Sequence, residues 1–243
     1  MRDIDPFELL LQGRFDEAEK IYTNMIKSNP TSQLFAGRAL VYLNMEEFDK
    51  ALADTMAAEE FSRREMPDRG DCHLQYVGLI LWLKGQEKEA AEQWFSLVRE
   101  MDAGKIAFSD MAGGVINGTL LWFAACFNHE LSEYKEKAEK YLKKKIKLSR
   151  AKYWPGPIAQ YLLGNLSDTE LRNAACEATG LLQKRHLCQA YFYIGVKAFH
   201  NGDIENCRKL MEESVKAGKL SLIEKEYYLA KHELARITRS LCV

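Results

Sequence analysis

The sequence predicts an all-α protein built from repeated pairs of antiparallel helices, and three observations indicate this fold class. Turn residues return at similar intervals, with 33 positions from Gly13 to Glu46 and 39 from Glu46 to Gly85. Around each turn, small and large apolar residues recur at the spacing of one helix face. The composition is 47% hydrophobic and 28% charged with 5 prolines, which suits a folded helical core. Self-similarity of this kind is typical of a solenoid, in which each unit packs on its neighbours.

The first repeat is visible in the segment QGRFDEAEKIYTNMIKSNP. The turn glycine Gly13 is followed by the aromatic Phe15, the small Ala18, the large Tyr22 and the terminating Pro30. The second repeat, RALVYLNMEEFDKALADTMAAEEF, has a similar order of residue sizes. Both segments are therefore predicted as helix–turn–helix units.

The third repeat shows the steric logic of the pattern. Gly78 and Ala90 are small, so two antiparallel helices can approach closely at these positions. Leu81 and Trp94 fill the space beside them, and Gly85 turns the chain between the helices. The segment therefore predicts a tightly packed helix pair.

The last repeat and the end of the chain complete the predicted array. Gly195 and Gly202 repeat the helix and turn positions, and about three periods separate Gly85 from Gly202, which leaves room for two degenerate helix pairs. An amphipathic segment with Tyr227 and Leu234 can cover the open end. We predict a single domain, 1–243, with clear units at about 7–30, 33–62, 72–102 and 188–217, degenerate pairs at about 105–182 and a closing helix at about 220–238.

These repeats resemble the tetratricopeptide repeat (TPR), whose period is about 34 residues. The resemblance implies a right-handed superhelical solenoid. The segment YWPGPIAQYLLGNLSDTEL, from Tyr153 to Leu171, further resembles bacterial TPR proteins of the outer-membrane lipoprotein NlpI type, as do CQAYFYIGVKAFHNGDIENC and LIEKEYYLAKHELARI. That family implies non-catalytic adaptors that dock hydrolases and a protease at the cell envelope. The start MRDIDPFELL has no recognisable export or lipidation signal, so we expect a cytoplasmic protein.

In TPR arrays the first helix of each pair lines a concave groove, and residues one turn from the packing positions face into it. The candidate partner-binding residues chosen in this way are Gln75, Leu79, Trp82, Phe123, Phe127, Gln189, Phe192 and Phe199. Such an aromatic groove with amide edges suits a partner helix or an extended apolar segment. The alternative interpretation is that these side chains pack between neighbouring helices or against the closing helix.

Charge gives little reason to expect nucleic acid or membrane partners. The chain has 34 basic and 35 acidic residues, a formal net charge of -1, and its apolar runs are too short to span a bilayer. One basic run could dock an acidic protein or a phosphate backbone, although acidic residues just before it favour a solvated face. The run comprises Lys143, Lys144, Lys145, Lys147, Arg150 and Lys152.

No catalytic or metal-binding signature is recognisable. The groups Cys72 with His73, and Cys176 with His186 and Cys188, do not have the paired-ligand spacing of zinc sites. Neither a phosphate loop nor a nucleophile motif occurs. We expect no metal, no cofactor and no small-molecule substrate, and a protein that is not an enzyme. The rival hypothesis is an enzyme whose site is hidden in the degenerate region, 110–182.

The sequence thus favours a non-catalytic TPR scaffold that binds a polypeptide partner in its concave groove, as an adaptor or an inhibitor. A sharper version is an immunity protein that neutralises a toxin domain. An envelope-hydrolase adaptor of the NlpI type is the alternative within the same class. Nucleic-acid binding through the basic run is a further reading, which predicts strongly salt-dependent binding.

Overall fold

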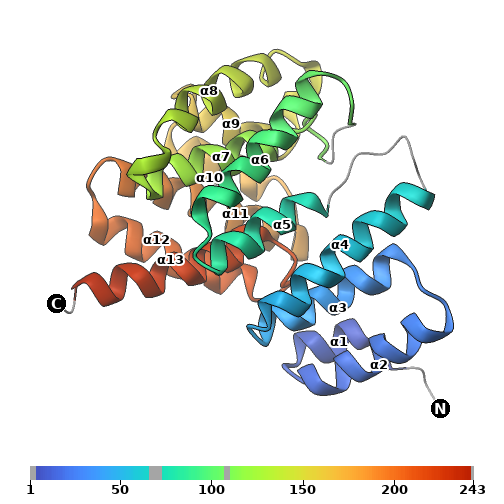
Figure 1. Ribbon diagram of the computed structural model, residues 1–243. Coiled ribbons are helices and arrows are strands. Elements are labelled where there is room, and N and C mark those ends of the chain that lie inside the picture. The colour runs from blue at the N-terminus through green and yellow to red at the C-terminus, as the bar shows by residue number, and fades with distance from the viewer. Residues whose placement is uncertain (1–3, 66–72, 107–109, 242–243) are drawn as a thin grey trace.

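The computed structural model describes residues 4–65, 73–106 and 110–241, and the regular structure within these ranges is entirely helical (Figure 1). The predicted all-α array with a C-terminal closing helix is confirmed. The helices are α1 (Pro6–Leu11), α2 (Phe15–Ser28), α3 (Ser32–Asn44), α4 (Phe48–Glu65), α5 (Leu74–Leu83), α6 (Glu87–Asp102), α7 (Val115–Phe127), α8 (Glu133–Lys145), α9 (Gly156–Leu162), α10 (Asp168–Cys176), α11 (Gly180–His200), α12 (Ile204–Gly218) and α13 (Lys225–Leu241), with short 3-10 turns η1 (His129–Leu131) and η2 (Ser149–Lys152).

The helices pack mainly on their neighbours in sequence, which is the organisation of a TPR-like solenoid. The main pairs are α3 with α4, α5 with α6, α7 with α8 and α11 with α12, and α2, α6 and α10 connect each pair to the next helix along. Local contacts therefore build most of the array.

The predicted turn positions share one backbone geometry. Gly13, Gly85 and Gly202 have φ values of 76°, 78° and 80°, and Glu46 has 60°. This left-handed conformation ends a helix and lets the next amide bond back to a helical carbonyl, as Gln86 N does to Leu81 O at 2.9 Å. Glycine adopts it without steric cost, which explains why the glycines mark the repeats in the sequence.

The same turn occurs in the degenerate middle of the chain. Gly164 has a φ of 82°, and the Asn165 amide donates to the Gln160 carbonyl at 2.9 Å. This turn joins α9 to α10, whose N-terminus carries a complete capping box between Ser167 and Glu170. The region around α9 and α10 is therefore a helix pair with shorter helices than its neighbours.

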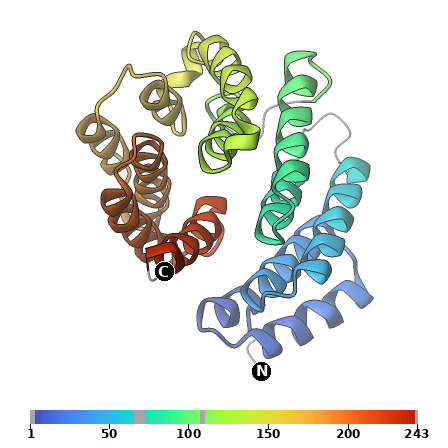
Figure 2. The same ribbon diagram turned by 60° about the vertical axis from the view of Figure 1, so that its left-hand side comes forward.

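The array curves so that its last helix, α13, returns to α5 (Figure 2). Helix α11 contacts α7, and α13 packs on α12 while also contacting α11 and α5. The last helix therefore lies against the inner side of the array and joins the C-terminal pair to the third pair.

The close approach of α5 and α6 generates a stability prediction. A Cβ atom at Gly78 would lie 2.3 Å from Nε1 of Trp94, which is fully buried and donates to the Gln75 carbonyl at 3.2 Å. We expect Gly78→Ala to lower the free energy of unfolding by about 1–3 kcal/mol, despite the better helix propensity of alanine. Chemical denaturation of the native protein and the variant measures this difference in the free energy of unfolding.

Gly195→Ala is the matched control, because its Cβ would lie 3.1 Å from Met211 Cε, the end of a flexible side chain, and 3.3 Å from Leu210 Cβ, both longer than the 2.3 Å approach at Gly78. Gly195→Ala should lower the free energy of unfolding clearly less than Gly78→Ala does. Equal effects of the two substitutions would contradict the steric explanation.

Candidate partner-binding site

The eight predicted groove residues lie in or against the core of the protein rather than along an open groove. Seven are buried, and Phe199 is half-buried. Their rings pack on one another: Trp82 lies 4.7 Å from Phe123, and Phe127 stacks on Phe199 at 4.1 Å between ring centroids. The alternative interpretation, packing between neighbouring helices and against the closing helix, describes this placement. The buried residues are Gln75, Leu79, Trp82, Phe123, Phe127, Gln189 and Phe192.

Helix α13 supplies the polar partners of this core. The Trp82 indole N–H donates to Oε1 of Glu233 at 2.6 Å, and the Gln189 amide donates to Oε2 of Glu226 at 3.1 Å. Tyr193 donates to the other oxygen of Glu226 at 3.2 Å. Both glutamates are almost fully buried, and the donors compensate part of the cost of removing a carboxylate from water.

Burial also changes the acidity of these two carboxyls. Desolvation raises the pKa of Glu226, and it raises the pKa of Glu233 to about 7, against the opposing effect of the Arg236 guanidinium. A protonated Glu233 therefore exists near neutral pH.

The repeat pattern predicted that these residues face the inner side of the array, but it did not predict what covers that side. The inward residues Gln75, Trp82 and Gln189 make hydrogen bonds with other parts of the chain, so their polar atoms are already used. Whether any of them contacts a partner stays a prediction.

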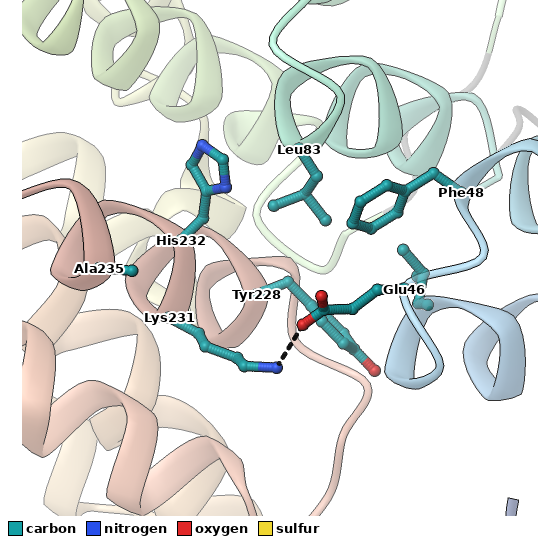
Figure 3. Close-up of a pocket in the computed structure, with 8 residues that line it drawn as sticks. Glu46, Phe48, Leu83, Tyr228, Lys231, His232 and Ala235 are labelled. Atoms are coloured by element: carbon teal, nitrogen blue, oxygen red, sulfur yellow. Dashed lines mark hydrogen bonds and ion pairs between the residues drawn. The ribbon is translucent and has the colours of Figure 1, made fainter.

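An open pocket of about 280 Å³ lies where α13 meets the turn between α3 and α4 (Figure 3). Leu43, Phe48 and Leu83 contribute apolar walls from the N-terminal part, and Tyr228 and Ala235 contribute from α13. Figure 3 shows the Phe48 and Leu83 side chains directed toward the space beside Tyr228 of α13. Phe48 and Leu83 are half-buried and Ala235 is exposed, so the pocket opens to solvent.

Charged side chains form the rim of this pocket. Lys231 on α13 pairs with Glu46 of the α3–α4 turn at 3.2 Å (Figure 3), and both are exposed. Exposed pairs contribute little stability, so this contact can open at small cost. Beside it, burial lowers the pKa of His232, which is therefore largely neutral at neutral pH.

The pocket continues along α3. A second cavity of about 130 Å³ is lined by Leu40, Leu43, Tyr76 and others, and Leu43 belongs to both. Ala36, Leu40 and Leu43 lie on one helix face because they are four and three positions apart. We call the two cavities together the α3 groove. Its complete lining is Ala36, Ala39, Leu40, Leu43, Glu46, Phe48, Thr55, His73, Tyr76, Leu83, Tyr228, Lys231, His232 and Ala235.

Sequence reasoning missed the α3 groove for two reasons. Leu43 and Phe48 belong to the second repeat, whereas the predicted groove residues all belong to the third and later repeats. The other wall comes from Tyr228 and Ala235, which are 180 or more residues away in the sequence. The apolar residues Leu40 and Leu43 on one face of α3 could have indicated this groove, because the repeat pattern assigns them no packing partner.

The other candidate residues are spread over the surface and the core. Cys188 is buried against Ser214, Cys176 is exposed, and His186 stacks on Trp154 at 4.5 Å between centroids. His73 contacts Ser32, and Cys72 lies outside the described residues. Within the described ranges, no group of three or more metal-ligating side chains is present. No helix in those ranges is long and apolar enough to cross a membrane.

The basic run lies at the end of α8 and in η2. Lys144 pairs with Asp102 at 2.6 Å, Lys143 approaches Glu139 at 3.9 Å, and Lys145 lies over the Tyr141 ring at 4.9 Å. Lys147 and Lys152 are exposed. Part of the run is therefore balanced by acidic neighbours, and part faces solvent.

The chain is similar to a helical-repeat protein of known structure. No family model and no curated protein matches the chain. Among solved structures, it is similar to a tetratricopeptide repeat protein from Parabacteroides merdae, with 15% identity, coverage of 95% of this chain and 80% of that chain, and a TM-score of 0.43. A similarity of this size establishes neither family membership nor function. The resemblance to the NlpI type stays a prediction.

The buried carboxyl of Glu233 generates a pH prediction. Because its folded pKa is raised, the folded state binds a proton more tightly than the unfolded chain, and stability falls as pH rises from the ordinary glutamate pKa toward 7. Glu233→Gln keeps an acceptor for Trp82 and cannot ionise. We expect the variant to gain roughly 2–3 kcal/mol relative to the native protein between about pH 5 and 8.

Denaturation curves recorded across this pH range measure that difference. Glu205→Gln is the control, since Glu205 is an exposed residue whose pKa is lowered by Arg208 rather than raised. Parallel stability profiles for the native protein and Glu233→Gln would show that Glu233 does not titrate in this range.

Proposed function

We propose that this protein is a non-catalytic scaffold that binds a polypeptide partner in the α3 groove. The observation that carries the proposal is an open apolar groove whose walls come from α3, α4 and α5 on one side and from α13 on the other. Helical-repeat arrays present extended surfaces of this kind to their partners.

The size of the pocket favours an anchoring side chain. At about 280 Å³ it is below the usual range for cofactor and drug-sized ligands, about 300–1,000 Å³, and the second cavity is smaller still. Protein interfaces obtain much of their affinity from one or two large apolar side chains inserted into such pockets. A partner helix or extended segment with a large apolar residue fits this geometry.

The rim supports the same class of partner. Glu46 and Lys231 place one charge of each sign at the opening, 3.2 Å apart. Nearby, Lys84 pairs with Asp49 at 2.6 Å. A segment whose anchor is flanked by polar or charged residues can exchange hydrogen bonds with these exposed groups, as in the polar rim of ordinary interfaces.

Two specific versions of this scaffold follow from the sequence. In the first, the partner is a toxin domain and the protein is its immunity protein. In the second, the partner is an envelope hydrolase and the protein is an adaptor of the NlpI type. The chemistry of the groove is the same for both, so the identity of the bound partner distinguishes them.

The degenerate middle does not support the rival enzyme hypothesis. Its described part consists of packed helices α7 to α10, and the hydrophobic face of α7 is buried. His129 lies in η1 and is exposed, whereas His186, just beyond this region, stacks on Trp154, and burial lowers its pKa to about 4. We therefore propose binding rather than catalysis.

A blocking substitution tests the α3 groove. Ala235 is exposed at the pocket edge, so Ala235→Trp should fill the pocket without disturbing the core. We expect Ala235→Trp to reduce the amount of captured partner at least tenfold, which corresponds to a loss of about 1.4 kcal/mol or more of binding free energy. Affinity capture from the native host followed by quantitative mass spectrometry measures this amount.

Ala53→Trp is the matched control, because Ala53 is also exposed on a helix but does not line the groove. Circular dichroism and thermal melting must show that both variants are folded. Capture of the same partner at equal yield by the native protein and Ala235→Trp would exclude the α3 groove as the binding site.

A further inference from the structure

We propose that a second surface, separate from the α3 groove, docks an acidic polypeptide segment that carries large aliphatic side chains. We call it the basic apolar surface. It combines exposed apolar side chains with a concentration of cations, and its residues come from the loop before α7, the end of α8 with η2, and the first turns of α11. Its members are Met111, Lys147, Leu148, Lys152, Tyr153, Leu181, Leu182 and Lys184.

Large apolar side chains are unusually exposed here. Met111 is 71% exposed, Leu181 53% and Leu182 49%. Together with Leu148 and Tyr153, they account for five of the ten exposed large hydrophobic residues among the described residues. The other five are distributed over α1, α2, α4 and the N-terminal and α12–α13 segments, so the concentration is local. Exposed apolar clusters with a polar rim mark interaction sites.

Side-chain contacts show that these segments meet. Met111 and Leu182 line one cavity of about 240 Å³, together with Trp154 and Arg185. Trp154 also stacks on His186 of α11. On the other side of the loop, a Cβ at Gly113 would lie 3.2 Å from Leu148 Cδ1, which brings the η2 segment next to Met111. Met111 and Leu182 therefore share one cavity, and Leu148 lies against the glycine turn that follows Met111.

The charge of this surface is one-sided. The segments 143–153 and 179–192 contain eight lysines and arginines and no acidic residue. Within the described part of the chain, Lys147, Lys152 and Lys184 make no ion pair.

The acidic groups that line the cavity are already engaged. Asp110 accepts the Gly114 and Ile116 amides at 2.9 and 3.0 Å and so caps α7, while Glu224 pairs with Arg185. The amide hydrogen bonds leave the negative charge of Asp110 in place, and Glu224 neutralises Arg185, so the three unpaired lysines outnumber this one carboxylate. The net complementarity is therefore toward a negative partner.

The arrangement of apolar and basic groups favours a polypeptide over other anionic partners. Nucleic acids bind basic surfaces through phosphates and stack bases on aromatic rings, whereas four of the five exposed apolar members are not aromatic and Tyr153 is the one ring among them. An anionic bilayer needs apolar groups that project together into a flat interface, whereas Met111 and Leu182 line a cavity. A protruding aliphatic side chain with acidic neighbours fits both features.

A peptide-selection experiment tests the proposal. A phage-displayed library of random peptides is selected on the full native chain at low salt, and enriched peptides are synthesised and measured by fluorescence anisotropy. We expect enriched peptides to carry net negative charge and at least two large aliphatic residues. Their Kd should rise at least tenfold for the double variant Leu182→Glu/Lys147→Glu, and rise again when salt increases from about 50 to 300 mM.

Controls separate this surface from general charge effects and from the α3 groove. Met56→Glu/Lys27→Glu makes the same chemical changes at exposed positions of α4 and α2, and should change Kd by less than about twofold. Ala235→Trp should leave peptide binding unchanged, so failure of the α3 groove and failure of this surface give different results. All variants are checked for native helicity and melting temperature.

Three outcomes would overturn the proposal. Enriched peptides without acidic bias, or with equal affinity for Leu182→Glu/Lys147→Glu, would show that the basic apolar surface does not select an acidic segment. Binding of single-stranded DNA that this variant abolishes, without selection of acidic peptides, would assign the surface to phosphate recognition. The same result with vesicles containing phosphatidylserine would assign it to a membrane surface.

Discussion

The contact between Trp82 on α5 and Glu233 on α13 closes the array, and much of the remaining structure depends on it. A buried carboxyl is costly without hydrogen-bond donors, and a buried indole N–H is costly without an acceptor, so each group stabilises the position of the other. Glu226 does the same with Gln189 and Tyr193. Because these contacts join residues about 150 positions apart or link α11 to α13, they fix the position of the last helix against the array.

Closure decides which surfaces remain for partners. Helix α13 covers the inner side at α5 and α11 but leaves the inner side of α3 open, which creates the α3 groove. The start of α13 lies instead beside the cavity that the basic apolar surface surrounds, where Glu224 holds Arg185. The two surfaces differ in chemistry: one is an apolar groove with paired charges at its rim, and the other is apolar with excess positive charge. Under the two proposals, the protein holds two different polypeptide segments.

The candidate site was less predictable than the fold. The predicted groove residues are apolar or amide-bearing, and burial against the chain's own last helix and burial against a foreign partner require the same residue types. Trp82 and Gln189 illustrate this ambiguity, since their N–H groups need acceptors in either case. Only the position of Glu233 and Glu226 shows which acceptors they use. The amphipathic pattern at 220–238 predicted a closing helix without its location.

The sequence by itself determined the helix pairs, because their signals are local: a left-handed turn at Gly13, Gly85 and Gly202 and a small residue such as Gly78 where two helices approach. Each of these depends on residues within one repeat. The tertiary structure alone decided that the inner side is filled and that Leu43 meets Tyr228 across the chain. Such contacts depend on the summed curvature of all repeats, which small changes in each helix crossing alter and no single repeat encodes.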